Sequence, residues 1–230
     1  QHKKSFGARP KYLFLAHLLG FNSMSDELLN ICEENDITLL EDCCESHGAT
    51  FKSEKIGNFG KASSFSFYYG HHMTTIEGGM VCTDDDEVYE KLLLIRSHGL
   101  LRELPKYMQK KYRDRKVDEN FTFVVPGYNV RSTDLNAVLG QMQLKDLDNH
   151  NNIRRNNFDV FASGLNRDKF HTDFKLEGNS SFCFPVITKS TREDTLALRK
   201  YLESQGVETR PIIAGNLYEH PFMDRVNQYR

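Results

Sequence analysis

The chain has 230 residues, of which 39% are hydrophobic, so it is long enough to form one large domain or one domain and part of another. Its 30 basic and 32 acidic side chains are spread along the sequence and give a net charge of -2, which argues against nucleic acid or an acidic membrane surface as the partner. No apolar run approaches the roughly 18 residues that span a bilayer, and the five cysteines follow no disulfide spacing, which indicates reduced thiols and a cytoplasmic protein.

The first half of the chain alternates apolar runs with amphipathic segments, a pattern typical of an α/β fold. Residues 12–16 predict a buried strand, and residues 25–34 predict a helix that begins with serine and aspartate start signals. A second strand is expected over residues 37–40. Glu41 and Asp42 follow it directly, which places carboxylates at the C-terminal end of a strand, where open α/β sheets bind ligands.

Two further strands are predicted at residues 64–67 and 80–83, on either side of a loop. A helix with three acidic residues at its start is expected from about residue 84 to Arg96. Residues 99–131 show little periodicity. Because a long segment without regular elements is usually functional or meets a partner, we expect it to contact a partner.

The second half begins with a predicted amphipathic helix over residues 133–147, with Thr133 as its N-cap. The polar stretch 148–155 is the expected domain boundary, or else a helix that joins two domains. The elements expected beyond it are typical of a smaller α/β domain: a strand over 182–187, a helix over 191–205 and a strand over 207–212.

Several polar groups fall at predicted strand ends or in loops, where side chains can converge on one cleft. Taken singly, each has a plain structural explanation: Asp42 as a turn-former, the pair His71-His72 as solvated side chains and Gly78-Gly79 as a turn. A zinc site built from Glu45 and the nearby histidines lacks any strong ligand spacing, and neither a P-loop nor a dinucleotide fingerprint occurs.

The order and spacing of the motifs resemble the nucleotide-sugar aminotransferases of the DegT/StrS type. The matching segments are 39–49, 56–60, 65–79, 96–99, 127–131, 143–144, 208–212 and 215–217. The resemblance implies the type I fold of pyridoxal-phosphate (PLP)-dependent transferases, similar to aspartate aminotransferase. It also implies that residues 1–148 are a cofactor-binding large domain lacking its N-terminal part, and that residues 149–230 are a small C-terminal domain lacking its end.

In that family, a lysine five residues after the serine of a serine–phenylalanine pair forms the Schiff base with PLP, and counting from Ser66 places His71 at that position. An imidazole forms no stable imine with the cofactor aldehyde, so covalent anchoring is excluded there. This departure resembles the sugar 3-dehydratases of the family. A histidine-bearing relative that carries an iron–sulfur cluster is disfavoured, because only Cys82 and Cys183 follow His71 and a cluster normally needs four cysteines.

The resemblance implies C3 deoxygenation of a nucleotide-linked 4-keto-6-deoxy sugar, with GDP-4-keto-6-deoxymannose as the expected substrate. Glutamate would convert PLP to pyridoxamine phosphate, and His71 would be the base of the reaction. Asp42 would pair with the pyridinium nitrogen, which makes the ring an electron sink. Ser66 would bind the phosphate, and Glu45 would contact the ring.

The resemblance also implies roles for residues farther along the chain. Asn129 would contact the cofactor phosphate from a neighbouring subunit, which implies a homodimer with a shared active site. His98, Arg102 and Arg210 would contact the substrate. Two other readings stay open: an ordinary aminotransferase whose chemistry uses another residue, and a non-catalytic protein that binds the cofactor or a nucleotide sugar.

Overall fold

The structure, a computed structural model, describes residues 9–112, 117–212 and 219–227. The chain divides into two compact units. The first contains residues up to 161 together with 175–184, and the second contains 162–174 and the residues from 185 onward. Each unit is described by itself.

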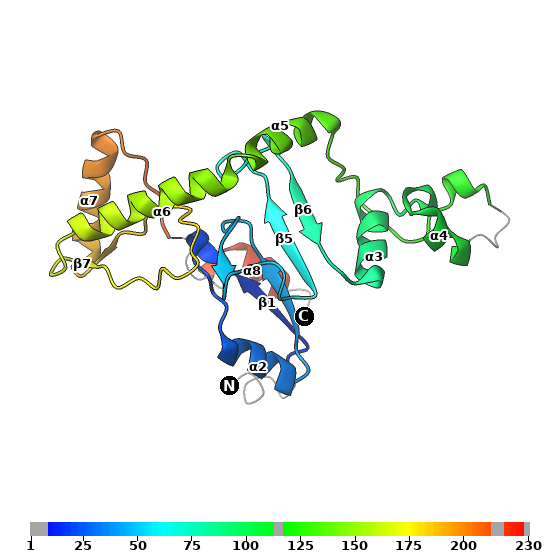
Figure 1. Ribbon diagram of the computed structural model, residues 1–230, viewed down its shortest axis with the longest axis horizontal. Coiled ribbons are helices and arrows are strands. Elements are labelled where there is room, and N and C mark those ends of the chain that lie inside the picture. Colours follow the sequence, from blue (N-terminus) through cyan, green and yellow to red (C-terminus); the bar gives the residue numbers. More distant parts are fainter. Residues whose placement is uncertain (1–8, 113–116, 213–218, 228–230) are drawn as a thin grey trace. The chain divides into compact units, whose positions relative to one another are not determined.

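A four-stranded sheet forms the centre of the first unit, with the strand order β1-β2-β5-β6 (Figure 1). Its strands are β1 (Tyr12–Ala16), β2 (Thr38–Asp42), β5 (Ala62–Ser66) and β6 (Gly79–Cys82). The first three are parallel and β6 is antiparallel to β5. Because Ala16 pairs with Asp42 and Asp42 with Ser64, the carboxyl ends of the parallel strands meet at one edge.

The connections within the sheet follow the sequence pattern closely. Helix α2 (Asp26–Glu34) joins β1 to β2, and the hydroxyl of its N-cap Ser25 accepts a hydrogen bond from the Leu28 N–H at 3.2 Å. Between β2 and β5 the chain forms a short hairpin of β3 (Thr50–Phe51) and β4 (Glu54–Lys55). Helix α3 (Asp86–Arg96) follows β6 and confirms the predicted helix.

The 97–131 segment includes residues 99–131, in which no regular element was predicted; its described residues form short helical turns around a small apolar core. The turns are η2 (Leu101–Glu103), α4 (Lys106–Gln109), η3 (Lys110–Tyr112) and η4 (Glu119–Phe121). Leu94 of α3 is buried together with Leu101, Leu104 and Met108. Such short turns lack the repeat length that a periodicity search detects. Contact of this segment with a partner stays a prediction.

Two helices carry the chain from this segment toward its second unit. Helix α5 (Asp134–Leu144) begins with Thr133 as N-cap, as predicted, in a capping box with Asn136. Helix α6 (Leu147–Gly164) continues through the polar stretch 148–155. Its buried Phe158 lies against Phe21 and Phe184, with ring centroids 6.0 and 4.7 Å away.

The second unit contains the β-ladder of β7 (Phe170–His171) with β8 (Ile187–Thr188), and the helices α7 (Arg192–Ser204) and α8 (Phe222–Asn227). The predicted helix over 191–205 is confirmed. The strand predicted over 182–187 is wrong except at Ile187, and the strand predicted over 207–212 does not form. Both runs contain a proline, Pro185 or Pro211, which has no N–H to donate to a ladder.

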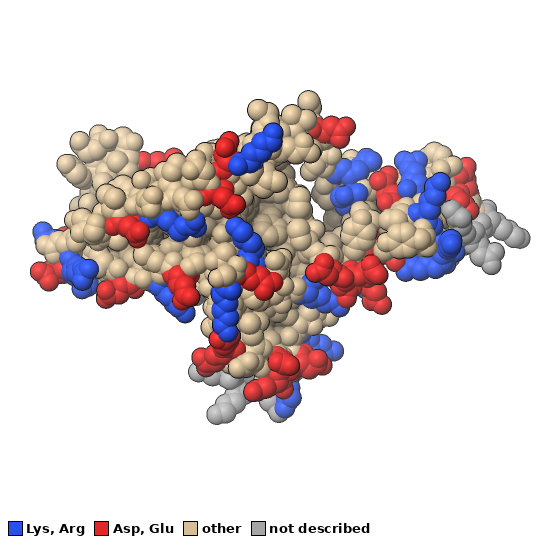
Figure 2. Space-filling model, in the orientation of Figure 1, with Lys and Arg blue, Asp and Glu red and all other residues tan. Residues whose placement is uncertain are grey.

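Two further properties of the molecule bear on function. None of the helices in the described ranges has both the length and the apolar character needed to cross a bilayer. On the face drawn in Figure 2, Lys and Arg side chains are interspersed with Asp and Glu, in keeping with the small net charge.

Candidate functional site

The candidate site lies at the edge where β2 and β5 end, and it includes the loop of residues 67–78 between β5 and β6. Asp42 is the last residue of β2 and Ser66 the last of β5. Ser66 pairs with Gly79 of β6, so the loop leaves the sheet and returns to it at the same edge. His71 lies within this loop and is half-buried. The topology therefore places a carboxylate, a hydroxyl and an imidazole at the ligand-binding edge of the sheet.

The hydrogen bonds of Ser66 define how its two polar groups are used. Its hydroxyl oxygen accepts a bond from the Tyr68 N–H at 3.2 Å, so the hydroxyl hydrogen is free to donate. Its carbonyl oxygen lies 3.4 Å from Nδ1 of His71. A carbonyl can only accept, so we assign the hydrogen of His71 to Nδ1, which leaves Nε2 as the basic atom.

Aromatic rings enclose the His71 imidazole. The ring of Tyr68 lies 5.6 Å away and that of Phe182 lies 5.5 Å away, both in edge-to-face arrangements with interplanar angles of 72° and 78°. Edge-to-face contacts of this kind favour one ring orientation over others. The orientation of His71 is therefore supported on two sides.

Side chains of α5 hold the 67–78 loop in place. The Gln143 amide accepts a bond from the Thr74 N–H at 3.0 Å and donates one to the Thr74 carbonyl at 2.7 Å. Asn136 donates to the Thr75 carbonyl at 2.7 Å. Gly140 lets the helix approach closely, because a Cβ there would meet the Thr75 methyl at 3.0 Å. The sequence pointed to Gln143 only through the family motif.

Two further histidines, His47 and His72, are buried behind His71. Their rings stack with centroids 5.6 Å apart, and Nε2 of His72 donates to the Ser180 carbonyl at 3.1 Å. Burial is the main cause that lowers the pKa of His47 to about 4 and that of His72 to about 3. Both rings are therefore neutral at neutral pH, and His71, which is half-buried, is the most accessible of the three.

Asp42 and Glu45 are tied to neighbouring backbone. Oδ1 of Asp42 accepts a bond from the Cys44 N–H at 3.0 Å. Oε2 of Glu45 accepts one from the Leu19 N–H at 2.8 Å, which fixes the turn η1 (Leu18–Gly20) after β1. Burial raises the pKa of the intervening Cys44 thiol to about 12, so this cysteine is not a thiolate nucleophile.

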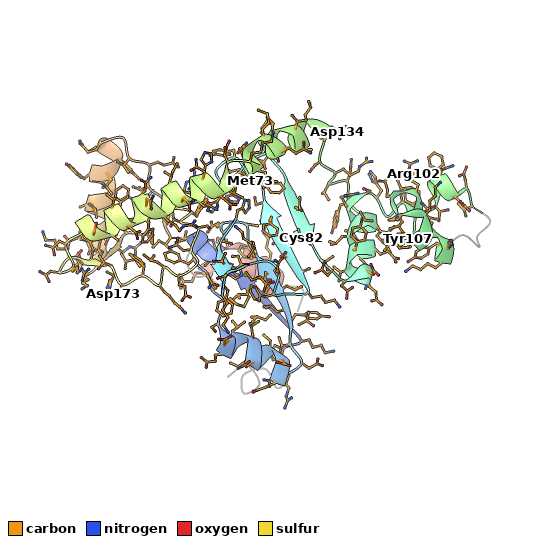
Figure 3. The ribbon with its side chains drawn as sticks, in the orientation of Figure 1. Met73, Cys82, Arg102, Tyr107, Asp134 and Asp173 are labelled. Atoms are coloured by element: carbon orange, nitrogen blue, oxygen red, sulfur yellow. The ribbon has the colours of Figure 1, made fainter. Side chains whose placement is uncertain are left out.

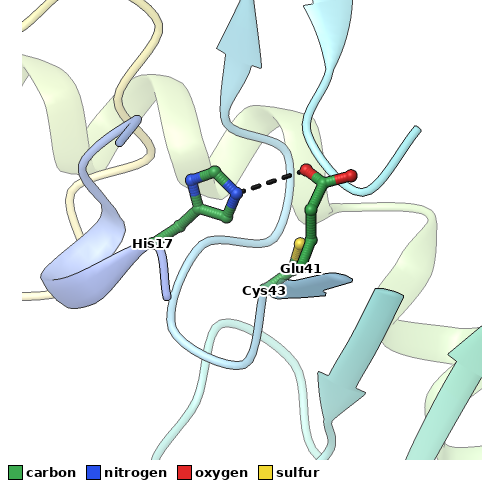
Figure 4. A group of neighbouring side chains, drawn as sticks. All are labelled: His17, Glu41 and Cys43. Atoms are coloured by element: carbon green, nitrogen blue, oxygen red, sulfur yellow. Dashed lines mark hydrogen bonds and ion pairs between the residues drawn. The ribbon is translucent and has the colours of Figure 1, made fainter. Parts of the chain in front are cut away.

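Glu41, one residue before Asp42, is fully buried and structural (Figure 4). Its carboxylate accepts bonds from the N–H groups of Gly57, Phe59 and Gly60 at 2.6 to 2.8 Å, and lies 3.2 Å from Nε2 of His17. Burial raises the pKa of Glu41, but these hydrogen bonds outweigh it and hold the pKa below its usual value. Sequence reasoning missed this role; the glycines at 57 and 60 were its signal.

His17, Glu41 and Cys43 form a compact cluster whose possible ligand atoms all lie within 4.8 Å of one another. The carboxylate is already occupied by backbone donors, however. The Ser23 N–H donates to Nδ1 of His17, so Nε2 carries the hydrogen toward Glu41. Burial also raises the pKa of the Cys43 thiol. The cluster is thus a hydrogen-bonded anchor for the loop after β4 rather than a metal centre.

Three of the predicted site residues, His98, Arg102 and Asn129, lie on the 97–131 segment that follows α3. Figure 3 labels Arg102 in this segment. The N–H of His98 donates to the Tyr128 carbonyl at 2.7 Å, and the next residue in that strand-like stretch, Asn129, bridges Ser97. Arg102 donates to the Asn120 carbonyl at 3.2 Å and lies over the Phe121 ring. His98 and Asn129 therefore lie close together.

Arg210, the last predicted site residue, lies in the second unit and is exposed. Its guanidinium donates to Oε1 of Glu208 at 3.0 and 2.9 Å. The structure therefore places the predicted residues in three groups: the sheet edge, the 97–131 segment and the second unit. A substrate role for Arg210 stays a prediction.

Comparison with known proteins places these features in a family. The profile of the DegT/DnrJ/EryC1/StrS aminotransferase family matches residues 3–230. A relative from Escherichia coli O55:H7, a GDP-4-keto-6-deoxy-D-mannose 3-dehydratase, is 41% identical over 91% of this chain and 55% of its own length. The chain therefore spans about half the length of this curated relative.

Solved structures give the same fold. A structure of the E. coli GDP-4-keto-6-deoxy-D-mannose-3-dehydratase with bound hydrated PLP superposes with a TM-score of 0.85 at 36% identity, over 98% of this chain and 58% of that one. A structure of GDP-4-keto-6-deoxymannose-3-dehydratase with a trapped PLP-glutamate geminal diamine gives 0.83 at 34% identity, over 99% and 58%. The predicted type I fold of PLP-dependent transferases is confirmed.

Proposed function

The chain belongs to the DegT/DnrJ/EryC1/StrS aminotransferase family, and we propose that it carries the active site of a PLP-dependent sugar 3-dehydratase. The reaction removes the C3 hydroxyl of a nucleotide-linked 4-keto-6-deoxy sugar, GDP-4-keto-6-deoxymannose, with glutamate as amino donor. The observation that carries the proposal is His71, an imidazole with Nε2 free, in the loop where the family's aminotransferases hold a lysine.

The residues at the sheet edge fit PLP or pyridoxamine phosphate held without a covalent bond. Asp42 offers a carboxylate for the pyridinium nitrogen, and the Ser66 hydroxyl has a hydrogen free for the phosphate. We assign Glu45, in the turn after β2, to contact with the cofactor ring. Residues 66–79 contain no lysine. When bound, the cofactor supplies an electron sink that no protein side chain provides.

His71 acts at one atom. With the cofactor and sugar bound, Nε2 would accept the proton released in the reaction, because the Nδ1 contact with the Ser66 carbonyl leaves Nε2 the unprotonated nitrogen. The imidazolium would then be the proton donor for the departing C3 hydroxyl. Tyr68 and Phe182 keep the ring from rotating between these two steps.

The cationic and polar residues outside the sheet edge suit a nucleotide diphosphate. Arg102 and Arg210 carry fixed positive charge, and guanidinium groups match phosphate oxygens in pairs. His98, four residues before Arg102, is a further donor. We assign all three to substrate binding, with Asn129 contacting the cofactor phosphate.

We further propose that the protein works as a homodimer in which Asn129 serves the partner's site. Exposed apolar side chains on both sides of Asn129 and along α5 support a second copy as the partner: Tyr128 is 70% exposed, Val130 65%, Leu135 79% and Met142 63%. Monomers seldom expose so many large apolar side chains in one region.

Two coarser assignments accompany this one. The division into a cofactor-binding domain, residues 1–148, and a small domain, residues 149–230, is likewise a proposal, and the first compact unit of the structure extends farther, to residue 161. The described cysteines are all free, which suits a protein of the reducing cytoplasm.

Replacement of His71 by asparagine tests the function directly. His71→Asn removes the basic atom but keeps a polar side chain, so we expect the rate of 3-deoxy sugar formation to fall by about 100-fold to 10,000-fold. The affinity for PLP, measured by absorbance titration, should change little. His150→Asn, an exposed histidine on α6, is the matched control. Undiminished turnover in His71→Asn would refute the proposal.

The non-catalytic alternative makes a different prediction. A protein that only binds the cofactor or sugar would form no 2-oxoglutarate from glutamate and no deoxygenated sugar. Measuring both products in one reaction separates the two possibilities, since the dehydratase must form them together with ammonia.

A further inference from the structure

Beside the site, residues 178–182 form a segment with a buried centre, of which the proposed mechanism uses only Phe182. Its backbone is bonded along its whole length: the Gly178 carbonyl accepts from the Thr50 N–H at 2.7 Å, and the Ser180 N–H donates to Gly20 at 2.8 Å. The Phe182 N–H donates to Leu19 at 3.1 Å. Asn179, Ser180 and Ser181 are all buried. This segment is therefore a fixed part of the first unit.

Arginines of α6 hold the same segment from its other side. Arg154 donates to the Phe182 carbonyl at 2.9 Å, and Arg155 donates to the Asn179 carbonyl at 3.1 Å. Gly20 permits the close approach of η1, because a Cβ there would lie 2.5 Å from the Phe182 nitrogen. The position of the Phe182 ring is thus set by backbone contacts at both Leu19 and α6.

His72 links this segment to the 67–78 loop. Its Nε2–H donates to the Ser180 carbonyl, its ring stacks on His47, and its ring centroid lies 5.7 Å from that of Phe182. Phe182 in turn contacts the His71 ring at 5.5 Å. Two consecutive histidines therefore contact the same phenylalanine, one from the buried side and one from the side of the site.

The backbone of Ser66 completes the arrangement. The Ser66 backbone, whose carbonyl lies beside Nδ1 of His71, also acts on His47: it raises the pKa of that ring, although burial lowers it more. Burial lowers the pKa of His72, and the charges of Arg154, His47 and His71 lower it further. His72 is therefore held neutral, as a donor to Ser180 that does not compete with His71 for a proton.

We propose that His72, with the 178–182 segment that it binds, sets the orientation of the His71 ring and so is a positioning residue for the proposed deoxygenation. The kinetic part of this inference rests on the proposed function, whereas its structural part does not. Loss of the support would let the His71 ring turn, so that Nδ1 no longer faces the Ser66 carbonyl and Nε2 no longer stays the free atom.

The test measures the tautomer of His71 by nitrogen-15 NMR of histidine-labelled protein, and in parallel the steady-state kinetics. His72→Phe keeps the buried ring but removes the donor, and His72→Gln keeps a distal N–H that can reach Ser180. In the unaltered protein we expect the neutral His71 ring to carry its hydrogen on Nδ1. His72→Phe should show a mixture of tautomers and a kcat lower by roughly 10-fold to 100-fold with KM little changed. His72→Gln should restore most of the Nδ1–H tautomer and most of kcat.

Phe182→Leu provides an independent variant, because it removes the ring between the two histidines and leaves His72 in place. It should shift the His71 tautomer in the same direction as His72→Phe. Phe161→Leu, at a ring that is 60% exposed, is the matched control and should leave the tautomer unchanged.

An Nδ1–H tautomer of His71 that persists in folded His72→Phe would overturn the inference. If His72→Phe does not fold, an unchanged tautomer in Phe182→Leu overturns it instead. If the unaltered protein forms no deoxygenated sugar, the proposed function fails, and the tautomer measurements still decide whether His72 orients His71.

Discussion

At the edge of the sheet, some residues are proposed to take part in the chemistry and others support the fold. Residues adjacent in the sequence can differ in this respect. Asp42, the last residue of β2, is half-buried, whereas Glu41, one position earlier, is fully buried and accepts hydrogen bonds from three backbone N–H groups. Alternation along a strand explains this, because successive side chains point to opposite faces. A motif of adjacent acids thus serves two purposes.

Glu41→Gln should destabilise the fold by about 3 kcal/mol. The amide NH2 of glutamine would face buried backbone N–H groups, which are donors as well and would lose their acceptor. The dependence on pH should change as well. Since the pKa of folded Glu41 lies below its unfolded value of about 4.3, the wild-type carboxylate stabilises above that pH and loses this contribution as the pH falls through the folded pKa. Urea unfolding between pH 7 and pH 3 measures both effects.

The expected result is a flatter acid limb for Glu41→Gln than for the wild type. Glu54→Gln, at an exposed glutamate of β4, serves as the control and should follow the wild-type curve. Equal stability of Glu41→Gln and wild type at neutral pH would show that the hydrogen bonds of the Glu41 carboxylate contribute little to the free energy of unfolding.

Ile76 is the second residue with a local consequence. It lies in the 67–78 loop with φ of 74°, in the left-handed region that β-branched residues rarely adopt, and its side chain is 65% exposed. Ile76→Gly should stabilise the protein by about 0.5 to 1 kcal/mol, since glycine adopts this φ without strain but loses more entropy on folding.

Thermal unfolding of Ile76→Gly checks this expectation, with Ile76→Val as the matched control that keeps the branched Cβ. A loss of stability in Ile76→Gly would mean that the isoleucine side chain makes contacts that outweigh the backbone strain.

At the scale of elements, the 67–78 loop depends on α5, a helix far along the sequence. The Gln143 side chain bonds to both the N–H and the carbonyl of Thr74, as the backbone of a neighbouring strand would. Gln143→Ala leaves the Thr74 N–H and carbonyl without their partner. We expect a loss of about 1 to 2 kcal/mol in unfolding free energy and faster hydrogen exchange at the Thr74 amide.

Gln141→Ala, at an exposed glutamine on the same helix, is the control for helix propensity. Unchanged exchange at Thr74 in Gln143→Ala would indicate that other contacts hold the loop. A decrease in deoxygenation rate would be expected alongside the faster exchange, because His71 belongs to this loop.

The elements that sequence patterns predicted well are those with local signals. Ser25 and Thr133 marked helix starts, and the apolar run at residues 12–16 marked β1 with its correct limits. The predicted burial of this strand is wrong, because β1 lies at the end of the sheet order and Tyr12 and Phe14 are exposed. The site residues Asp42, Ser66 and His71 came from the resemblance to the family, and their roles stay predictions. The local signals act over a few residues, so they survive without tertiary information.

Other features depend on contacts between distant segments and left little trace in the sequence. The 182–187 run looked like a strand, but Phe182 bonds to Leu19 instead, a tertiary pairing that no local pattern encodes. The bond of His72 to Ser180 spans 108 positions. The clamp of Glu41 on the loop at Gly57 is of the same kind, and so these supports were not foreseen.

At the scale of the whole molecule, the exposed apolar side chains of α5 and of the stretch around Asn129 are the features that bear on assembly. If these cover each other in a dimer, a charge placed on α5 should weaken association. Leu135→Glu replaces a side chain that is 79% exposed, so it should cost the folded monomer little.

Sedimentation velocity over a range of protein concentrations checks this expectation. We expect the wild type to be a dimer. The dimer dissociation constant of Leu135→Glu should be at least about tenfold higher, which corresponds to a loss of about 1.4 kcal/mol in the free energy of association. Leu196→Glu, at an exposed leucine of α7, is the control. A monomeric wild type, or a Leu135→Glu variant that associates normally, would contradict the proposed interface.

The central claim is that an imidazole at residue 71 directs the reaction to deoxygenation. The most direct measurement mixes the intact protein with PLP, glutamate and GDP-4-keto-6-deoxymannose and identifies the sugar product by mass spectrometry and NMR. The account predicts a 3-deoxy-4-keto sugar with one ammonia released per sugar and 2-oxoglutarate formed from glutamate. A 4-amino sugar that retains its C3 hydroxyl, formed without ammonia, would contradict it.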